Sequence, residues 1–458
     1  MIGIIFSSFL ALTLIMCFVR IRFGIAMYMF YSILVPFTQF LSFGKNFVPV
    51  VILIALFFNY GFKNLYYKPL VPFLFFFIAQ LCIIPFHDDV SYGIQFNFLR
   101  SDFMSALLLP FAIVNVVNRD QKALKLFMKT MIAAITIAAG YSLFLVTIAG
   151  SNPYLLLIMP LNGSEFNDAY ASTENAGRIF GRISGVFSHP MTNGLFLSLS
   201  AIYVFFQILD SSKPKEKMFF IALLVVVFLS IFFIGVRSAI AASALGLLLF
   251  ILIERKFQLA FALLIGSIVL LLVISQIPGM GDFIYSIVDS KSSAVGGSSV
   301  AMRESQLNGA LQEIEFNPLF GKGYGWTIQY KLTRGLHPVL LSFESLLYVV
   351  LCNNGIVGVI IWIVMLIAFL KRVRRTFESR YFALVAVLMT VYVSYSLITG
   401  EYGYMAYFLI FYALMWMYGL SKYRKLPRKY KNRVAFDNRL RKGYGNIPSK
   451  LTPSQNLT

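Results

Sequence analysis

Two arginines stand out in a chain that is otherwise rich in apolar residues. Arg237 lies in a short turn between two long apolar runs, with no acidic residue near it in the sequence. Arg303 falls on the apolar stripe of a short amphipathic stretch, and this stripe consists of Val300, Leu307, Leu311 and Ile314. An unpaired guanidinium is costly away from water, whereas its rigid pair of N–H donors matches a phosphate. The two residues therefore predict an anion-binding site at a membrane surface.

The sequence does not identify the binding partner of either arginine. Arg237 could bind either a lipid phosphate or a substrate phosphate, because both present the same oxygen atoms. For Arg303, an internal salt bridge to Glu344 or Asp282 competes with a bound anion.

Two further polar residues precede an apolar run that begins near residue 191. Pro190 suits the first turn of a helix, so Arg182 and His189 should lie close to a helix N-terminus. Backbone N–H groups and the helix dipole favour an anion there, which makes both residues candidates for supporting substrate binding. The alternative is that Arg182 extends to the membrane interface and His189 only caps the helix.

His337 and Glu344 are the candidates for proton transfer. They are seven residues apart, so they share one face if this stretch is helical. A neutral imidazole is suited to accept a proton near neutral pH, so we assign the role of general base to His337 first and to Glu344 second. A purely structural role for His337 is the alternative.

The composition predicts the fold class. Hydrophobic residues make up 59% of the chain, charged residues 13%, and the mean hydropathy is +0.78. These values are typical of a polytopic membrane protein with an all-α fold. A membrane-spanning helix needs about 20 apolar residues. We predict thirteen such runs, with twelve as the main alternative, at 2–19, 24–43, 46–62, 69–86, 103–117, 131–149, 191–209, 218–236, 238–253, 258–276, 354–370, 381–399 and 402–420.

These runs predict a single helical membrane domain over residues 1–420 and a basic cytoplasmic tail over residues 421–458. The first run lacks a basic leader and a small-residue cleavage site, so we expect a retained helix. Most of the 39 Lys and Arg residues fall in alternate connections and in the tail. Cytoplasmic loops retain basic residues, so this bias accounts for the net charge of +20 without a nucleic-acid partner.

The same bias directs the long connections 87–102, 150–190 and 277–353 outward. They hold all three histidines, so we expect any chemistry on the outer face. The sequence has no nucleotide-binding glycine loop and no metal-ligand spacing, and we predict neither a metal nor a cofactor.

An ordered set of residues resembles the bacterial O-antigen ligase and O-antigen polymerase superfamily. The set runs from Arg182 and His189 through Arg237 and Arg303 to a Pro-x-x-Gly-x-Gly turn at 318–323, His337 and Gly355–Gly358. The likeness covers about residues 180–370. Pro338 departs from the family pattern, in which Asn is frequent, and Ile240 and Ala241 stand where Leu is often found.

This resemblance implies a glycosyltransferase of the bacterial inner membrane. Such an enzyme takes a sugar chain from undecaprenyl diphosphate on the periplasmic side, without a metal or nucleotide. Arg237 and Arg303 would then hold the diphosphate, and His337 would lie beside the reacting hydroxyl. We favour polymerisation of surface-polysaccharide repeat units slightly over ligation.

The expected partners are the lipid-linked oligosaccharide and the bilayer. A protein that regulates chain length could be a further partner. The alternative function is a transporter or flippase of lipid-linked oligosaccharide. Transporters tend to have duplicated halves and ionisable residues near the bilayer midplane, and the apolar runs here are nearly free of charge.

Overall fold

The structure is a computed structural model that describes residues 2–35, 39–61, 65–87, 89–148, 152–158, 182–255, 276, 300–343, 345–377, 379–400 and 402–425. Within these ranges the backbone forms helices, turns and one isolated bridge between His337 and Leu341, and no strand. The predicted all-α fold is confirmed.

Nine helices in the described part of the chain are long and apolar enough to cross a membrane, as expected of a multi-pass membrane protein. In lipid a helix satisfies all its backbone hydrogen bonds internally, so long apolar runs adopt this form. Two of the nine are composite: η1–α4–η2 (Lys68–Leu70, Val71–Ile83, Ile84–Phe86) and α5–η3–α6 (Tyr92–Phe103, Met104–Leu108, Leu109–Arg119). The others are α7 (Gln121–Thr147), α10 (Pro190–Asp210), α11 (Pro214–Phe233), α12 (Arg237–Glu254), α17 (Leu346–Thr376), α18 (Ser379–Ile398) and α19 (Tyr404–Lys425).

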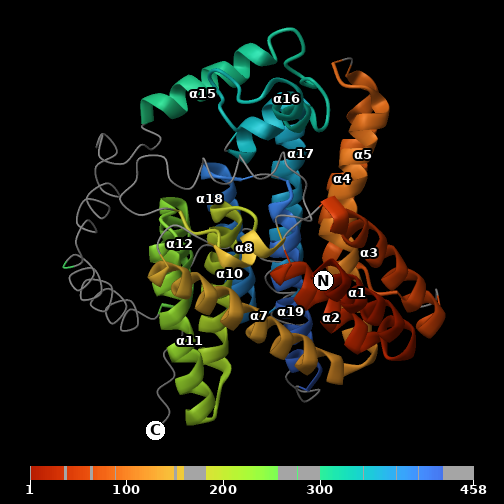
Figure 1. The fold of residues 1–458 in the computed structure, drawn as a ribbon, viewed down its shortest axis with the longest axis vertical. Coiled ribbons are helices and arrows are strands. Elements are labelled where there is room, and N and C mark those ends of the chain that lie inside the picture. Colours follow the sequence, from red (N-terminus) through yellow and green to blue (C-terminus); the bar gives the residue numbers. More distant parts are fainter. Residues whose placement is uncertain are drawn as a thin grey trace, which may run out of the picture.

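Six other helices are described. Three are apolar: α1 (Ile2–Val19), α2 (Ile21–Leu34) and α3 (Gln39–Tyr60). The remaining three are α8 (Pro153–Ile158), α15 (Val300–Glu313) and α16 (Trp326–Arg334). In Figure 1, α15 and α16 lie together at one end of the bundle, above the first turns of α17. We call this end the cap end.

The predicted runs overlap these helices, except that 258–276 lies outside the described residues apart from position 276. Several boundaries were wrong by more than a few residues. The second run ends at Leu34 rather than residue 43, the last helix continues to Lys425, and the connection 87–102 contains α5. Three other helices begin earlier than predicted, α3 at Gln39 rather than 46, α7 at Gln121 rather than 131 and α17 at Leu346 rather than 354.

Helix α5 was missed because its apolar content is low, and tertiary contacts stabilise it instead. The Gln95 side chain donates to Val90 O at 2.8 Å and accepts from the backbone N–H of Tyr324 at 3.0 Å. The Tyr324 hydroxyl donates to Asp102 Oδ2 at 2.8 Å. Two hydrogen bonds thus join α5 to the segment after α15.

Helix α10 forms the centre of the bundle and is buried along most of its length. Small residues let its neighbours approach closely. A Cβ added at Gly194 would lie 2.8 Å from the Tyr395 hydroxyl of α18 and 3.2 Å from Ala239 Cβ of α12. Small residues at helix contacts are typical of membrane bundles.

Candidate functional site

Arg237 is the first residue of α12, directly after the turn formed by residues 234–236. Gly235 in this turn has a φ of +72°, a conformation in which glycine is favoured over other residues. The Ile183 N–H donates to Ile234 O at 3.3 Å, so the segment that carries Arg182 runs beside the turn that leads to Arg237. The side chains of Arg182 and Arg237 are both half-buried.

The last turn of helix α18 lies beside the starts of α10 and α17. The Tyr395 hydroxyl donates to Met191 O at 2.6 Å, and the Ser345 hydroxyl donates to Leu397 O at 2.6 Å. Arg182 lies within electrostatic range of Tyr395. The first turns of α10, α12 and α17 and the last turn of α18 therefore meet at the cap end.

His189 is the N-cap of α10, and its Nδ1 accepts the backbone N–H of Met191 at 3.2 Å. Although His189 as a whole residue is exposed, desolvation lowers the pKa of its imidazole to about 4, and the charges of Arg182 and Lys331 act in the same direction. The imidazole is thus neutral near pH 7. His189 thus caps α10, and a histidine that caps a helix can also lie beside an anion bound at the helix N-terminus.

Lys331 in α16 was not among the sequence candidates. Its charge acts on His189, so α16 brings a further cation to the Arg182 region. The signal in the sequence was weak, because Lys331 and Arg334 in the last turn of a short helix are also an ordinary means of stabilising a helix C-terminus.

Arg303 lies in α15, and its Nη1 donates to Gln306 Oε1 at 3.1 Å. Gln306 is fully buried. The Tyr348 hydroxyl of α17 donates to Arg303 O at 3.0 Å, which joins α15 to the first turn of α17. Asp282 and Glu344, the alternative ion-pair partners, lie outside the described residues.

The predicted apolar stripe of α15 needs correction. Leu307 and Leu311 are 37% and 47% exposed, whereas Gln306 and Ala310 are buried, and of the predicted stripe Ile314 is buried as expected. The covered face is therefore rotated by about one residue. Arg303, three residues before Gln306, lies half-buried at this covered face.

His337 is buried and does not lie in a helix. Its Nδ1 accepts the backbone N–H groups of Val339 at 3.1 Å and Leu340 at 2.9 Å. These two donors leave Nδ1 without a proton, so Nε2 carries the hydrogen and donates it to Glu313 Oε1 at 3.1 Å. In this geometry neither ring nitrogen is free to accept a proton from a substrate.

Glu313 joins His337 to a second partner, because its Oε2 lies 3.1 Å from Lys322 Nζ. Burial raises the pKa of Glu313, but the hydrogen bonds from His337 and Lys322 outweigh it and hold the pKa below its ordinary value. The carboxylate connects the end of α15, the turn 318–323 and the loop after α16. Sequence reasoning did not single out Glu313 or Lys322.

Acid should weaken this cluster. The folded-state pKa of Glu313 lies below its ordinary value of 4.5, so its contribution is present above pH 4.5 and is lost as the pH falls through the folded pKa. We expect the wild type to be more stable than Glu313→Gln by roughly 1 kcal/mol at pH 7, because the half-exposed pair is partly screened by solvent. Thermal melts of both proteins between pH 7 and pH 3.5 measure this difference. A gap in melting temperature that does not narrow on acidification would contradict the assigned charge.

The turn 318–323 packs against a break in α17. Gly355 interrupts the helix with φ +59° and ψ −157°. Two hydrogen bonds run from the turn to the helix, Lys322 N to Cys352 O at 2.9 Å and Gly323 N to Asn353 O at 2.8 Å, and two run back, Ile356 N to Pro318 O and Val357 N to Leu319 O, both at 3.0 Å. We call this paired arrangement the glycine clasp. The turn is thus hydrogen-bonded on both sides of the interruption at Gly355.

The structure therefore gathers the candidates in two neighbouring groups at the cap end. Arg182, His189 and Arg237 lie where α10 and α12 begin. Arg303 and His337 lie on the segments that cover this end, and the hydrogen bond from Tyr348 to Arg303 O ties the second group to α17. Glu344 lies outside the described residues. Among the described residues, no group of three or more His, Cys, Asp or Glu could hold a metal ion.

The O-antigen ligase family matches residues 220–363 of this chain. The matched segment runs from α11 into α17 and contains Arg237, Arg303, His337 and the whole glycine clasp, while Arg182 and His189 precede it. A search of curated proteins finds no match. The match identifies an O-antigen ligase-type domain and agrees with the resemblance seen in the sequence.

Proposed function

We propose that this chain, a member of the O-antigen ligase and O-antigen polymerase superfamily, is a glycosyltransferase of the bacterial inner membrane. It transfers a sugar chain from undecaprenyl diphosphate to an acceptor hydroxyl on the periplasmic face, without a metal. Polymerisation of repeat units is slightly favoured over ligation. The observation that carries the proposal is that Arg182, Arg237 and Arg303, from three separate segments, all lie at the cap end of a bundle that carries the family domain.

The chemistry needs cations at this position. The anomeric C–O bond to the diphosphate breaks, the acceptor oxygen forms the new glycosidic bond, and the leaving diphosphate gains negative charge. Preorganised guanidinium groups stabilise that charge more in the transition state than in the ground state. In the proposal Arg237 and Arg303 hold the diphosphate, and Arg182 and His189 support it.

The acceptor hydroxyl must lose its proton as it attacks. Both nitrogens of His337 are engaged in the described geometry, so His337 could act as the base only after releasing Val339 and Leu340 or Glu313. This favours Glu344 as the base and gives His337 the task of ordering the loop that leads to it. His337 remains the second candidate.

The orientation rests on charge. The end of the bundle opposite the cap carries basic residues at the start of α11 and at the end of α17. They are Lys213, Lys215, Lys217, Lys371, Arg372, Arg374 and Arg375. Basic residues mark the cytoplasmic side of short connections, so we place the cap end in the periplasm and the C-terminal tail in the cytoplasm.

The test is activity of the purified protein in detergent on an undecaprenyl-diphosphate oligosaccharide. A glycosyltransferase gives a longer lipid-linked product or a product on a second acceptor, together with free undecaprenyl diphosphate. Movement of the intact substrate across vesicles without formation of a bond would replace the proposal with a flippase. In cells, loss of the protein should leave single-repeat surface glycolipid for a polymerase and accumulated lipid-linked polymer for a ligase.

A further inference from the structure

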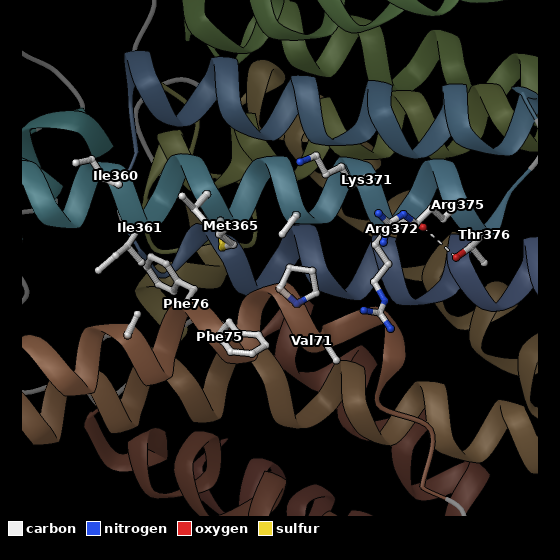
Figure 2. A pocket seen from close by; sticks show the side chains of 14 residues that line it. Val71, Phe75, Phe76, Ile360, Ile361, Met365, Lys371, Arg372, Arg375 and Thr376 are labelled. Carbon is white, nitrogen blue, oxygen red and sulfur yellow. Dashed lines mark hydrogen bonds between the residues drawn. The ribbon is translucent and has the colours of Figure 1, made fainter. Parts of the chain in front are cut away.

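A cavity of about 680 Å³ lies between α4 and the second half of α17, far from the cap end. Figure 2 shows Val71, Phe75 and Phe76 of α4 facing Ile361 and Met365 of α17 across it. Phe75 is 67% exposed and Val364 is 58% exposed, so the cavity opens sideways toward lipid. We call this cavity the lateral groove.

Three cations line one end of the lateral groove. Lys371, Arg372 and Arg375 lie in the last turns of α17 and line the groove there, and Figure 2 labels all three. Among the described residues, no carboxylate lies within ion-pair distance of any of the three. The hydroxyl of Thr376, which also lines the groove, donates to Arg372 O at 3.0 Å.

This arrangement carries an electrostatic cost that an anion would remove. Lys371 and Arg375 are four residues apart, and Arg372 and Arg375 are three apart, so like charges neighbour each other on the helix surface. Topology alone requires basic residues at a cytoplasmic helix end, but it does not require three of them to border one groove.

The two parts of the lateral groove select a single class of ligand. A phosphate would satisfy the cations, and Arg binds it through two parallel N–H donors. The apolar part would serve no purpose for a water-soluble anion, and the cations would serve none for a neutral lipid. The matching ligand is an amphiphile with long hydrocarbon chains and an anionic, phosphate-bearing headgroup.

We propose that the lateral groove binds a phospholipid with an anionic headgroup. Its acyl chain lies between α4 and α17, and its phosphate lies among Lys371, Arg372 and Arg375. The site is separate from the glycine clasp, because Lys371 is 16 residues after Gly355, about 24 Å along a helix at 1.5 Å per residue. That distance is close to the thickness of a hydrocarbon core, so the bound headgroup lies at the membrane surface opposite the cap.

A bound lipid would hold α4 against α17. These helices already pack through Phe73 and Phe369, whose rings are 5.6 Å apart. The far end of the same pair carries the cap, since Asn317 donates to Phe86 O at 3.2 Å and the clasp is built on α17. The expected consequence is greater thermal stability of the whole bundle, because a ligand that binds only the folded state stabilises it.

The experiment measures the melting temperature of the delipidated protein in detergent with added phosphatidylglycerol, with phosphatidylcholine of the same chains, and with inorganic phosphate. We expect phosphatidylglycerol to raise the melting temperature by at least about 3 °C, and the other two additions to have little effect. The triple variant Lys371→Gln, Arg372→Gln, Arg375→Gln should lose this increase. The matched control Lys215→Gln, Lys217→Gln removes exposed charges at the same end of the bundle and should keep it.

A second variant tests the apolar part. Ala368→Trp fills the lateral groove without changing charge, and it should also abolish the increase caused by phosphatidylglycerol. Equal stabilisation by phosphatidylcholine would show that the headgroup is not recognised, and stabilisation by inorganic phosphate alone would show an anion site without a lipid. Persistence of the increase in the triple variant would overturn the proposal. None of these outcomes depends on glycosyltransferase activity.

Discussion

Replacing Arg303 by alanine is expected to lower the rate of polymer formation by at least about 100-fold, the typical effect of losing one electrostatic donor to a developing anion. Arg237→Ala should have an effect of the same size, because both guanidinium groups are proposed to contact the diphosphate. Arg303→Lys keeps the charge but loses the planar pair of donors, so it should also be strongly impaired. The measurement is product formed per minute from a defined lipid-diphosphate oligosaccharide by protein matched for membrane expression.

The control for charge is Arg334→Ala. Arg334 is an exposed cation of α16 at the same end of the molecule, and its guanidinium lies 5.4 Å from the centre of the Tyr330 ring. Its loss should change the rate by less than about threefold, the range expected when only a distant, screened charge is removed. Normal activity of both Arg303→Ala and Arg237→Ala, with the protein correctly inserted, would contradict the diphosphate-binding role.

The arginines could be found from the sequence because charge is conspicuous in an apolar chain. Arg237 stands directly before a long apolar run, and a guanidinium there needs an explanation whatever the tertiary structure. The membrane helices could also be predicted from the sequence, because a run of about 20 apolar residues has few stable conformations other than a membrane-spanning helix.

What the sequence could not supply is the set of contacts that position the site. The Gln95 side chain accepts a hydrogen bond from the Tyr324 N–H, although the two residues are 229 positions apart in the chain. No sequence pattern near either residue indicates this contact. The same holds for Glu313, whose carboxylate looks like an ordinary charge at a helix end until His337 and Lys322 are seen beside it. Propensity and periodicity describe segments, and such pairs are set by tertiary packing.

His337 illustrates the limit most directly. The histidine side chain suggested a general base, because an ordinary imidazole can accept a proton near neutral pH. A histidine acts as a base only through a ring nitrogen that is not already engaged in a hydrogen bond. The turn after His337 directs two backbone N–H groups at Nδ1, and Glu313 accepts from Nε2. A hydrogen-bond arrangement of this kind depends on backbone direction over a few residues, which the sequence pattern does not specify.

The largest expected loss of stability comes from Gly355→Ala and Gly321→Ala in the glycine clasp. A Cβ at Gly355 would lie 2.5 Å from Leu319 O and 2.6 Å from Pro318 O, and one at Gly321 would lie 2.6 Å from Gly355 N. These neighbours are backbone atoms, which cannot rotate away as a side chain can. Both glycines also have positive φ, which costs about 1–2 kcal/mol for other residues. Adding about 1–3 kcal/mol for overpacking, we expect each variant to lose about 3 kcal/mol or more.

Gly61→Ala separates the two causes. Gly61 also has a positive φ, at +69°, but no atom lies within 4 Å of the position its Cβ would take. This variant should therefore lose only about 1 kcal/mol, the strain of the backbone alone. Thermal melts and the yield of monodisperse protein in detergent measure all three variants. If Gly355→Ala and Gly321→Ala melt at the same temperature as Gly61→Ala, the close backbone contact between the turn 318–323 and α17 is not what holds the cap in place.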